Sequence, residues 1–267
     1  MDKLKQYFEQ SPALSTALIT SFCVGLLLLA KIFEKDPAPL FNLPRLCLLG
    51  SITFFVIYFL KHAKWDVASG LTNRFSNWHS RWWLATAPLI IIAFLSLTSV
   101  NWHGLTLSYE AIFAWLLTNV ATGLFEEVLM RGLCFYVLLK AWGKSKYGVY
   151  KAAFFQALIF GLAHLGNLYH MPTLDVIAQV TFATLIGIGF AGLVLLTKSL
   201  WPAIIVHTLI NAAGTINTFF VLSDVEFQSP GIDVYLVIIA LFFVFSTLPG
   251  LLYLKAATPR ILKKQGV

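Results

Sequence analysis

The sequence predicts an all-α protein, a polytopic transmembrane helical bundle of about eight spans that forms a single membrane-embedded domain over residues 1–267. Hydrophobic residues make up 58% of the chain and charged residues only 12%, which is too few charges to coat a water-facing surface of this size. Long apolar segments recur along the chain, without the short alternation typical of an outer-membrane barrel. These observations exclude a disordered chain, a disulfide scaffold and an ordinary soluble enzyme.

Eight segments approach or exceed the length of about 20 apolar residues that a helix needs to cross the hydrocarbon core. They lie at about residues 13–30, 46–60, 83–100, 111–139, 149–165, 174–197, 200–221 and 234–254. The first segment follows Pro12 and is not closed by a small-residue cleavage site, so we expect a retained span and not a signal peptide. The second segment is short and the fourth is long, so the ends of these two are the hardest to place.

The distribution of basic residues predicts the orientation of the bundle. Most of the 19 lysines and arginines lie at the N-terminus, in the loops 61–82 and 140–151, at Lys198 and in the C-terminal tail. The loops without lysine or arginine are 101–110, 166–173 and 222–233. Because short basic loops remain in the cytoplasm, we expect both termini there. The loop 31–45 departs from this pattern, since it carries Lys31, Lys35 and Arg45, and it leaves the orientation of the first two spans open.

Ionisable side chains inside the spans are the strongest functional signal, because a charge in a membrane costs several kcal/mol by most estimates. The polar positions are Glu126, Glu127 and Arg131 in the fourth segment, His164 in the fifth, and His207 and Asn211 in the seventh. Glu127 and Arg131 are four residues apart, so they share a helix face and can pair. Glu126 lies about 100° around the helix from Glu127.

If the polar faces of the fourth, fifth and seventh segments turn toward one another, the bundle assembles the groups needed to hydrolyse an amide. A carboxylate and an imidazole can take a proton from water and return it to the leaving amine. A second imidazole and a side-chain amide can stabilise the oxyanion of the tetrahedral intermediate. Each pattern alone also has a structural interpretation, as a helix-joining ion pair or a hydrogen-bonded core histidine. Amide hydrolysis is predicted because the three polar patterns occur together, each in a different span of one chain.

Three patterns carry a resemblance to a known family: EExxxR at Glu126–Arg131, FxxxH at Phe160–His164 and HxxxN at His207–Asn211. In this order they resemble the motifs of the CPBP intramembrane proteases, which include the type II CAAX prenyl endopeptidases and many bacterial Abi-like homologues. The resemblance covers a core of about residues 110–215, or four or five spans. It implies an intramembrane endopeptidase that cleaves a peptide bond near the cytoplasmic membrane face.

The resemblance also implies roles for individual residues. Glu126 would activate the attacking water with assistance from His164, while His207 and Asn211 would form the oxyanion site. The supporting residues, which would orient the pocket or form its wall, are Glu127, Arg131 and Phe160. The implied partners are a membrane-associated peptide or protein substrate and the lipid bilayer, with no nucleic acid.

The family has been described both as metalloproteases and as glutamate-type proteases. The sequence has no HExxH motif, although Glu126, His164 and His207 could supply three zinc ligands with an open position. Asn211 is a poor zinc ligand and a good oxyanion donor, and each candidate span supplies one histidine. A metal-independent mechanism without a cofactor is therefore favoured, with zinc as the alternative.

Two other classes of function fit parts of the pattern. Buried glutamate and histidine can relay protons in a proton-coupled membrane transporter, but no inverted repeat or broken helix is evident in the sequence. A non-catalytic membrane scaffold would not require the complete set of motifs.

Two further features lie in the fifth and sixth segments. Gly187, Gly189 and Gly192 predict a close helix contact, because small residues let membrane helices approach each other. Gln156 lies four residues before Phe160 on the same face, so it either joins the polar pocket or bonds another helix.

Overall fold

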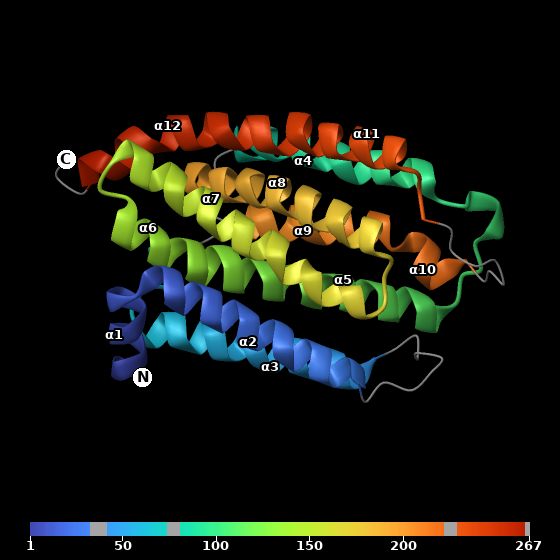
Figure 1. Ribbon diagram of the computed structural model, residues 1–267, viewed down its shortest axis with the longest axis horizontal. Helices are drawn as coiled ribbons and strands as arrows, with labels where there is room; N and C mark the ends of the chain where they lie inside the picture. Colours follow the sequence, from blue (N-terminus) through green and yellow to red (C-terminus); the bar gives the residue numbers. More distant parts are fainter. Residues whose placement is uncertain (33–41, 74–80, 222–228, 265–267) are drawn as a thin grey trace.

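The all-α architecture is confirmed by the computed structural model, which describes residues 1–32, 42–73, 81–221 and 229–264. The described chain forms long helices that run side by side along the longest axis of the molecule (Figure 1). The α-helices are α1 (Asp2–Gln10), α2 (Pro12–Ile32), α3 (Leu43–His62), α4 (Arg81–Ser96), α5 (Tyr109–Glu127), α6 (Tyr136–Trp142), α7 (Lys146–Ala163), α8 (Thr173–Thr197), α9 (Trp201–Gly214), α10 (Ile216–Phe220), α11 (Ile232–Phe242) and α12 (Leu248–Lys264).

Seven stretches of the described chain have the length and hydropathy to cross a membrane. They are Pro12–Ala30, Leu43–His62, Trp82–Ser99, Tyr109–Trp142, Lys146–Tyr169, Thr173–Thr197 and Ile232–Lys263. Each corresponds to one predicted segment. The remaining predicted segment, 200–221, is divided into α9 and α10, which meet at Thr215. In Figure 1, α1 and the last turns of α12 lie at the end of the bundle that holds the α6–α7 turn. The chain therefore crosses the bundle an even number of times between them, and α9 with α10 makes one of these passes.

The long central span changes its helical geometry in its middle. After Glu127 the α5 helix widens into the π-helix η4 (Val128–Phe135), and α6 then completes the span. All eight residues of η4 are buried. A π-helix is rare and often coincides with a functional site, because the wider turn re-aims neighbouring side chains. The widened turn begins directly after the two adjacent glutamates, which indicates a functional site at this depth of the bundle.

Close contacts of α8 with its neighbours depend on the predicted glycines. A Cβ atom on Gly187 would lie only 2.8 Å from the Cβ of Ala157 in α7. Gly192 faces the backbone of Gly250 in α12, where a side chain would collide with the main chain. Gly189 makes the same kind of contact near the π-helix η6 (Phe243–Thr247). These glycines therefore act in packing, as small residues commonly do between membrane helices.

The connection between α3 and α4 packs against the bundle, although it carries basic residues. Trp65 and Leu71 are buried, and the backbone turns back against the short connection between α8 and α9. The carbonyl of Gly70 accepts a hydrogen bond from the Leu200 amide at 3.0 Å, and the carbonyl of Leu71 accepts one from the Trp201 indole at 3.1 Å. Residues 63–73 thereby fix the beginning of α9. Residues 74–80 of this loop, and residues 33–41 of the loop that departs from the charge pattern, lie outside the described residues.

Candidate active site

Glu127 lies at the centre of the polar site. Its side chain is completely buried, and its Oε1 atom accepts hydrogen bonds from Arg131 Nη1 and from His207 Nδ1, each at 2.7 Å. The expected pairing of Glu127 with Arg131 is therefore present, and a contact from α5 to α9 is added to it. An ionised carboxylate can only accept, so the Nδ1 atom of His207 carries the hydrogen.

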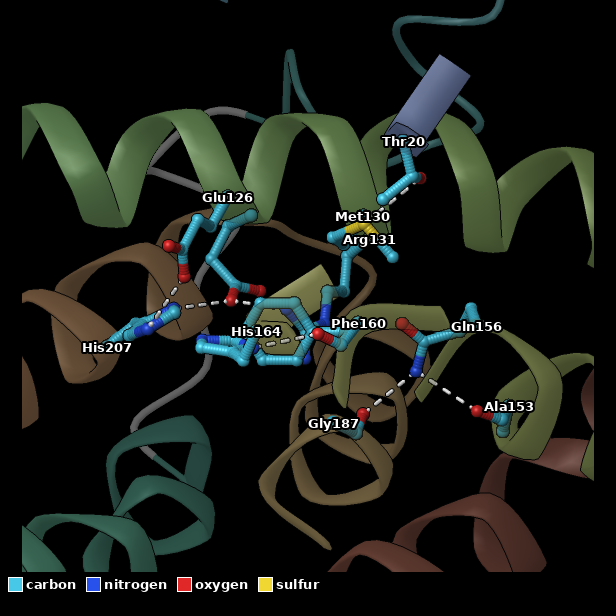
Figure 2. Close-up of polar contacts among 11 residues, drawn as sticks. Thr20, Glu126, Met130, Arg131, Ala153, Gln156, Phe160, His164, Gly187 and His207 are labelled. Atoms are coloured by element: carbon cyan, nitrogen blue, oxygen red, sulfur yellow. Dashed lines mark hydrogen bonds and ion pairs between the residues drawn. The ribbon is translucent and has the colours of Figure 1, made fainter. Parts of the chain in front are cut away.

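Glu126 approaches the other nitrogen of the same imidazole. Its Oε2 atom lies 3.4 Å from His207 Nε2, so two successive carboxylates face the two ring nitrogens of one histidine (Figure 2). The two carboxylates differ in exposure, since 22% of the Glu126 side chain is accessible and none of the Glu127 side chain is. Glu126 is therefore the carboxylate that a water molecule or a substrate can reach, whereas Glu127 is a buried partner.

Two phenylalanines hold the charged groups of the site in place. The Arg131 guanidinium carbon lies 4.6 Å from the centroid of the Phe160 ring and 5.0 Å from that of Phe190, so the cation is enclosed by two aromatic rings. The His207 ring stacks on Phe190 at 5.1 Å and meets Phe160 edge to face at 6.1 Å. Phe160 thus contacts both Arg131 and His207. Phe190 was not predicted, because a phenylalanine in an apolar helix gives no sequence signal.

His164 lies at the end of α7, where the helix tightens into the 3₁₀ turn η5 (His164–Tyr169). Its ring is partly exposed and meets Phe160 edge to face at 5.1 Å, with Nδ1 2.9 Å from the Phe160 carbonyl oxygen. A carbonyl only accepts, so Nδ1 donates and the lone pair is on Nε2. His164 and His207 both contact the ring of Phe160. The carboxylates of Glu126 and Glu127 contact His207.

Asn211 follows His207 by one turn of α9 and is partly exposed. Within the described chain its side-chain amide forms no hydrogen bond, so the amide hydrogens are available to a ligand. Its backbone carbonyl accepts from the Thr215 hydroxyl at 2.8 Å. The HxxxN spacing therefore gives one imidazole and one amide on a single helix face, as expected.

A hydrogen-bonded contact between α5 and α9 was missed by the sequence interpretation. Asn119 is buried and its Nδ2 atom donates to the Thr215 hydroxyl at 3.0 Å, while the Trp115 indole donates to the Ala212 carbonyl at 3.0 Å. The sequence does contain a signal for it. Asn119 lies seven residues before Glu126, two turns along the same helix face, and Thr215 lies four residues after Asn211.

Gln156 takes the second of its two predicted roles, because it bonds another helix. Its buried side chain donates from Nε2 to the carbonyl of Gly187 at 2.9 Å and to that of Ala153 at 3.0 Å (Figure 2). It thereby joins α7 to α8 one turn before Phe160.

The candidate zinc ligands do not form a ligand set in this arrangement. Across the described residues, no group of three histidine, cysteine, aspartate or glutamate side chains is placed to hold a metal ion. Both ring nitrogens of His207 face carboxylates, and among the described residues the hydrogen-bonding contact of His164 is to the Phe160 carbonyl. Glu126, His164 and His207 therefore do not fit a three-ligand zinc centre here.

The fold and site define an integral, multi-pass membrane protein with a carboxylate–histidine site inside its helices. Residues 108–213 match a family model described as type II CAAX prenyl endopeptidase Rce1-like. The matched region contains all three motifs, so the CPBP resemblance is confirmed for this part of the chain, and the match supports a membrane protease. Comparison of the chain with curated proteins and with solved structures gave no match.

Proposed function

We propose that the protein is an intramembrane endopeptidase of the CAAX-protease-like type, in which glutamate and histidine activate water. One observation carries the proposal. Two adjacent carboxylates of a spanning helix face the two nitrogens of His207, and only that of Glu126 is accessible. This arrangement lies inside the region matched to the Rce1-like family.

The proposed base is Glu126, with His164 as its assistant. A water molecule beside the Glu126 carboxylate would lose a proton to it as the oxygen attacks the scissile carbonyl. The Nε2 lone pair of His164, which is left free by the bond from Nδ1 to the Phe160 carbonyl, is suited to accept a hydrogen bond from that water. The proton would then pass to the leaving amine.

The proposed oxyanion site consists of His207 and Asn211. When Nε2 of His207 is protonated, the imidazolium is balanced by Glu127 and can donate a hydrogen bond toward the reaction space. The free amide of Asn211, one turn further along α9, supplies a second donor. Glu127 and Arg131 would act by holding the imidazole in this orientation, since both are completely buried.

The proposed scissile bond lies close to a membrane-anchored or C-terminal segment of the substrate, toward the cytoplasmic side. His207 is six residues after Trp201, the first residue of α9, which corresponds to about 9 Å of helix rise. This beginning of α9 is the part that residues 63–73 hold, on the same side as the basic loops.

A proton-coupled transporter gains one observation from the structure. The last part of the seventh predicted segment is broken at Thr215, and transporters often bind ions at broken helices. The match to a protease family favours the endopeptidase. Uptake of a solute into vesicles by the reconstituted protein, with no peptide cleavage, would reverse this order.

The proposal is tested by comparing the membrane peptides of cells that carry the intact protein with those of cells that carry Glu126→Gln. We expect at least one peptide product to disappear in the variant, because glutamine cannot accept the proton from water. Glu110→Gln is the matched control, since Glu110 is an exposed glutamate at the beginning of the same helix. An unchanged set of products in Glu126→Gln membranes, at equal protein abundance, would contradict the proposal.

A further inference from the structure

Asn119 and Thr215 form a polar contact between two spanning helices, outside the three motifs. Asn119 Nδ2 donates to Thr215 Oγ1 at 3.0 Å. The Oδ1 atom of the same amide lies 3.3 Å from Thr215 Oγ1, so both polar atoms of the Asn119 side chain face the hydroxyl. Asn119 is only 3% exposed. A buried amide in an apolar helix costs free energy unless it is hydrogen-bonded, and here the bond crosses to another span.

The same hydroxyl also contacts the backbone of a proposed oxyanion residue. Thr215 Oγ1 donates to the Asn211 carbonyl at 2.8 Å, and the Thr215 amide donates to that carbonyl at 3.0 Å. A threonine hydroxyl in a helix often bonds the carbonyl four residues earlier. What distinguishes Thr215 is that it additionally has a partner on α5.

Trp115 extends the contact by one turn of α5. Its indole nitrogen donates to the carbonyl of Ala212 at 3.0 Å, and Asn119 also donates to the Trp115 carbonyl at 2.8 Å. The final carbonyls of a helix have no partner within the helix, so they require partners from elsewhere. At the end of α9 the Ala212 carbonyl receives such a donor from Trp115 of α5, whereas the Asn211 carbonyl receives its donors from Thr215 itself.

The consequence concerns the register of two helices. The helix α5 carries Glu126 and Glu127 two turns beyond Asn119. The helix α9 carries Asn211 one turn before Thr215 and His207 two turns before it. A shift of α9 along α5 would change the distances from His207 to both carboxylates. The contact between Asn119 and Thr215 opposes such a shift at the end of α9 opposite to residues 63–73.

We propose that Asn119 and Thr215 are positioning residues, which set the placement of Asn211 and His207 relative to the two glutamates. This inference rests on the proposed function, because its effect on cleavage presupposes the roles of Glu126 and Asn211. It adds two residues outside the three motifs, which act through the helix that carries the oxyanion donors.

The test compares Thr215→Val, which removes the hydroxyl and keeps the shape, with Thr215→Ser, which keeps the hydroxyl. The readout is the rate at which the Glu126-dependent membrane peptide appears. We expect Thr215→Val to lower this rate by about 10- to 100-fold, as misplacement of a reacting group by about 1 Å does, and Thr215→Ser to restore it to within about threefold. The control is Thr181→Val, because the Thr181 hydroxyl bonds the Ile177 carbonyl of its own helix at 2.9 Å.

Asn119→Ala provides a second route to the same contact if Thr215→Val fails to fold. We expect the Asn119→Ala and Thr215→Val effects to be strongly non-additive in the double variant, since each removes the same hydrogen bond. Equal losses in Thr215→Ser and Thr215→Val, or additive effects of the two substitutions, would overturn the inference.

A spectroscopic measurement separates this inference from the proposed function. In protein labelled with ¹⁵N-asparagine and held in micelles, Thr215→Val is expected to shift the side-chain amide signal of Asn211. The signal of Asn167, whose amide bonds Gln179 at 2.7 Å, is expected to stay in place. An unshifted Asn211 signal would contradict the positioning role, whether or not a peptide product depends on Glu126. Loss of the Glu126 dependence with a shifted Asn211 signal would instead contradict the proposed function alone.

Discussion

The Nδ1 atom of His207 lies 2.7 Å from Oε1 of Glu127, and this buried contact joins two spans that are 80 residues apart in sequence. The same carboxylate oxygen binds Arg131, so the negative charge of Glu127 is shared by two donors. The contact fixes which nitrogen of His207 carries the hydrogen and turns Nε2 toward Glu126. The site therefore extends from the buried pair of Glu127 and Arg131 through His207 to the accessible carboxylate of Glu126.

Removal of Arg131 is predicted to destabilise the protein, because the charge of Glu127 would stay buried without its main partner. We expect Arg131→Met to lower the free energy of unfolding by about 3–5 kcal/mol, measured by denaturant unfolding in micelles. The double variant Glu127→Gln/Arg131→Met is expected to lose less than the sum of the two single variants. Additive losses would show that the two side chains do not depend on each other.

Gly70 is predicted to tolerate no side chain. Its φ angle is +86°, and a Cβ atom there would lie 3.0 Å from both the Lys198 carbonyl oxygen and the Ser199 Cα. We expect Gly70→Ala to reduce stability by about 1–3 kcal/mol in the same unfolding measurement. Gly50→Ala is the control, since no heavy atom lies within 4 Å of its Cβ position. Similar stability of the two variants would indicate that residues 63–73 do not hold the beginning of α9.

The proposed mechanism predicts that cleavage does not depend on a bound metal. We expect the purified protein to keep its activity after dialysis against a chelator, and elemental analysis to find far less than one zinc per chain. The geometric reason is that, among the described residues, no group of three histidine, cysteine, aspartate or glutamate side chains is placed to hold a metal ion. Stoichiometric zinc, with activity that is lost on its removal and regained on its return, would contradict the glutamate-type proposal.

The charge distribution predicts which end of the bundle lies in the cytoplasm. In a Cys47→Ser background, we expect His103→Cys to react with an impermeant maleimide on intact cells and Lys144→Cys to react only after permeabilisation. Cys23 and Cys134 are buried, so Cys47 is the native thiol that has to be replaced. Labelling of Lys144→Cys in intact cells would invert the proposed orientation.

The helical architecture and much of the site could be predicted because both depend on local spacing. Glu127 and Arg131 are four residues apart, so an α-helical period alone brings them together. His207 and Asn211 share a face for the same reason. The lengths of the apolar segments likewise predicted eight spans, of which seven match the stretches that can cross a membrane and one is divided into α9 and α10.

Other parts depend on contacts between distant segments, which spacing does not reveal. The helical period placed Glu126 and Glu127 on different azimuths, yet both reach His207 because the imidazole extends between them and offers a nitrogen to each. Phe190 stacks on that ring from an apolar helix. Trp65 lies in a basic loop, yet it is buried against neighbouring aromatic rings, including that of Phe59 at 5.7 Å.

The central claim is that Glu126 activates the water that cleaves a peptide bond. The most direct measurement uses purified protein in lipid vesicles, with the precursor of a product that depends on Glu126 in cells, and compares the cleavage rate of the unaltered chain with that of Glu126→Gln. The account predicts cleavage by the unaltered protein and none above background by Glu126→Gln, with both proteins equally folded and inserted. Equal cleavage rates for the two proteins would contradict it.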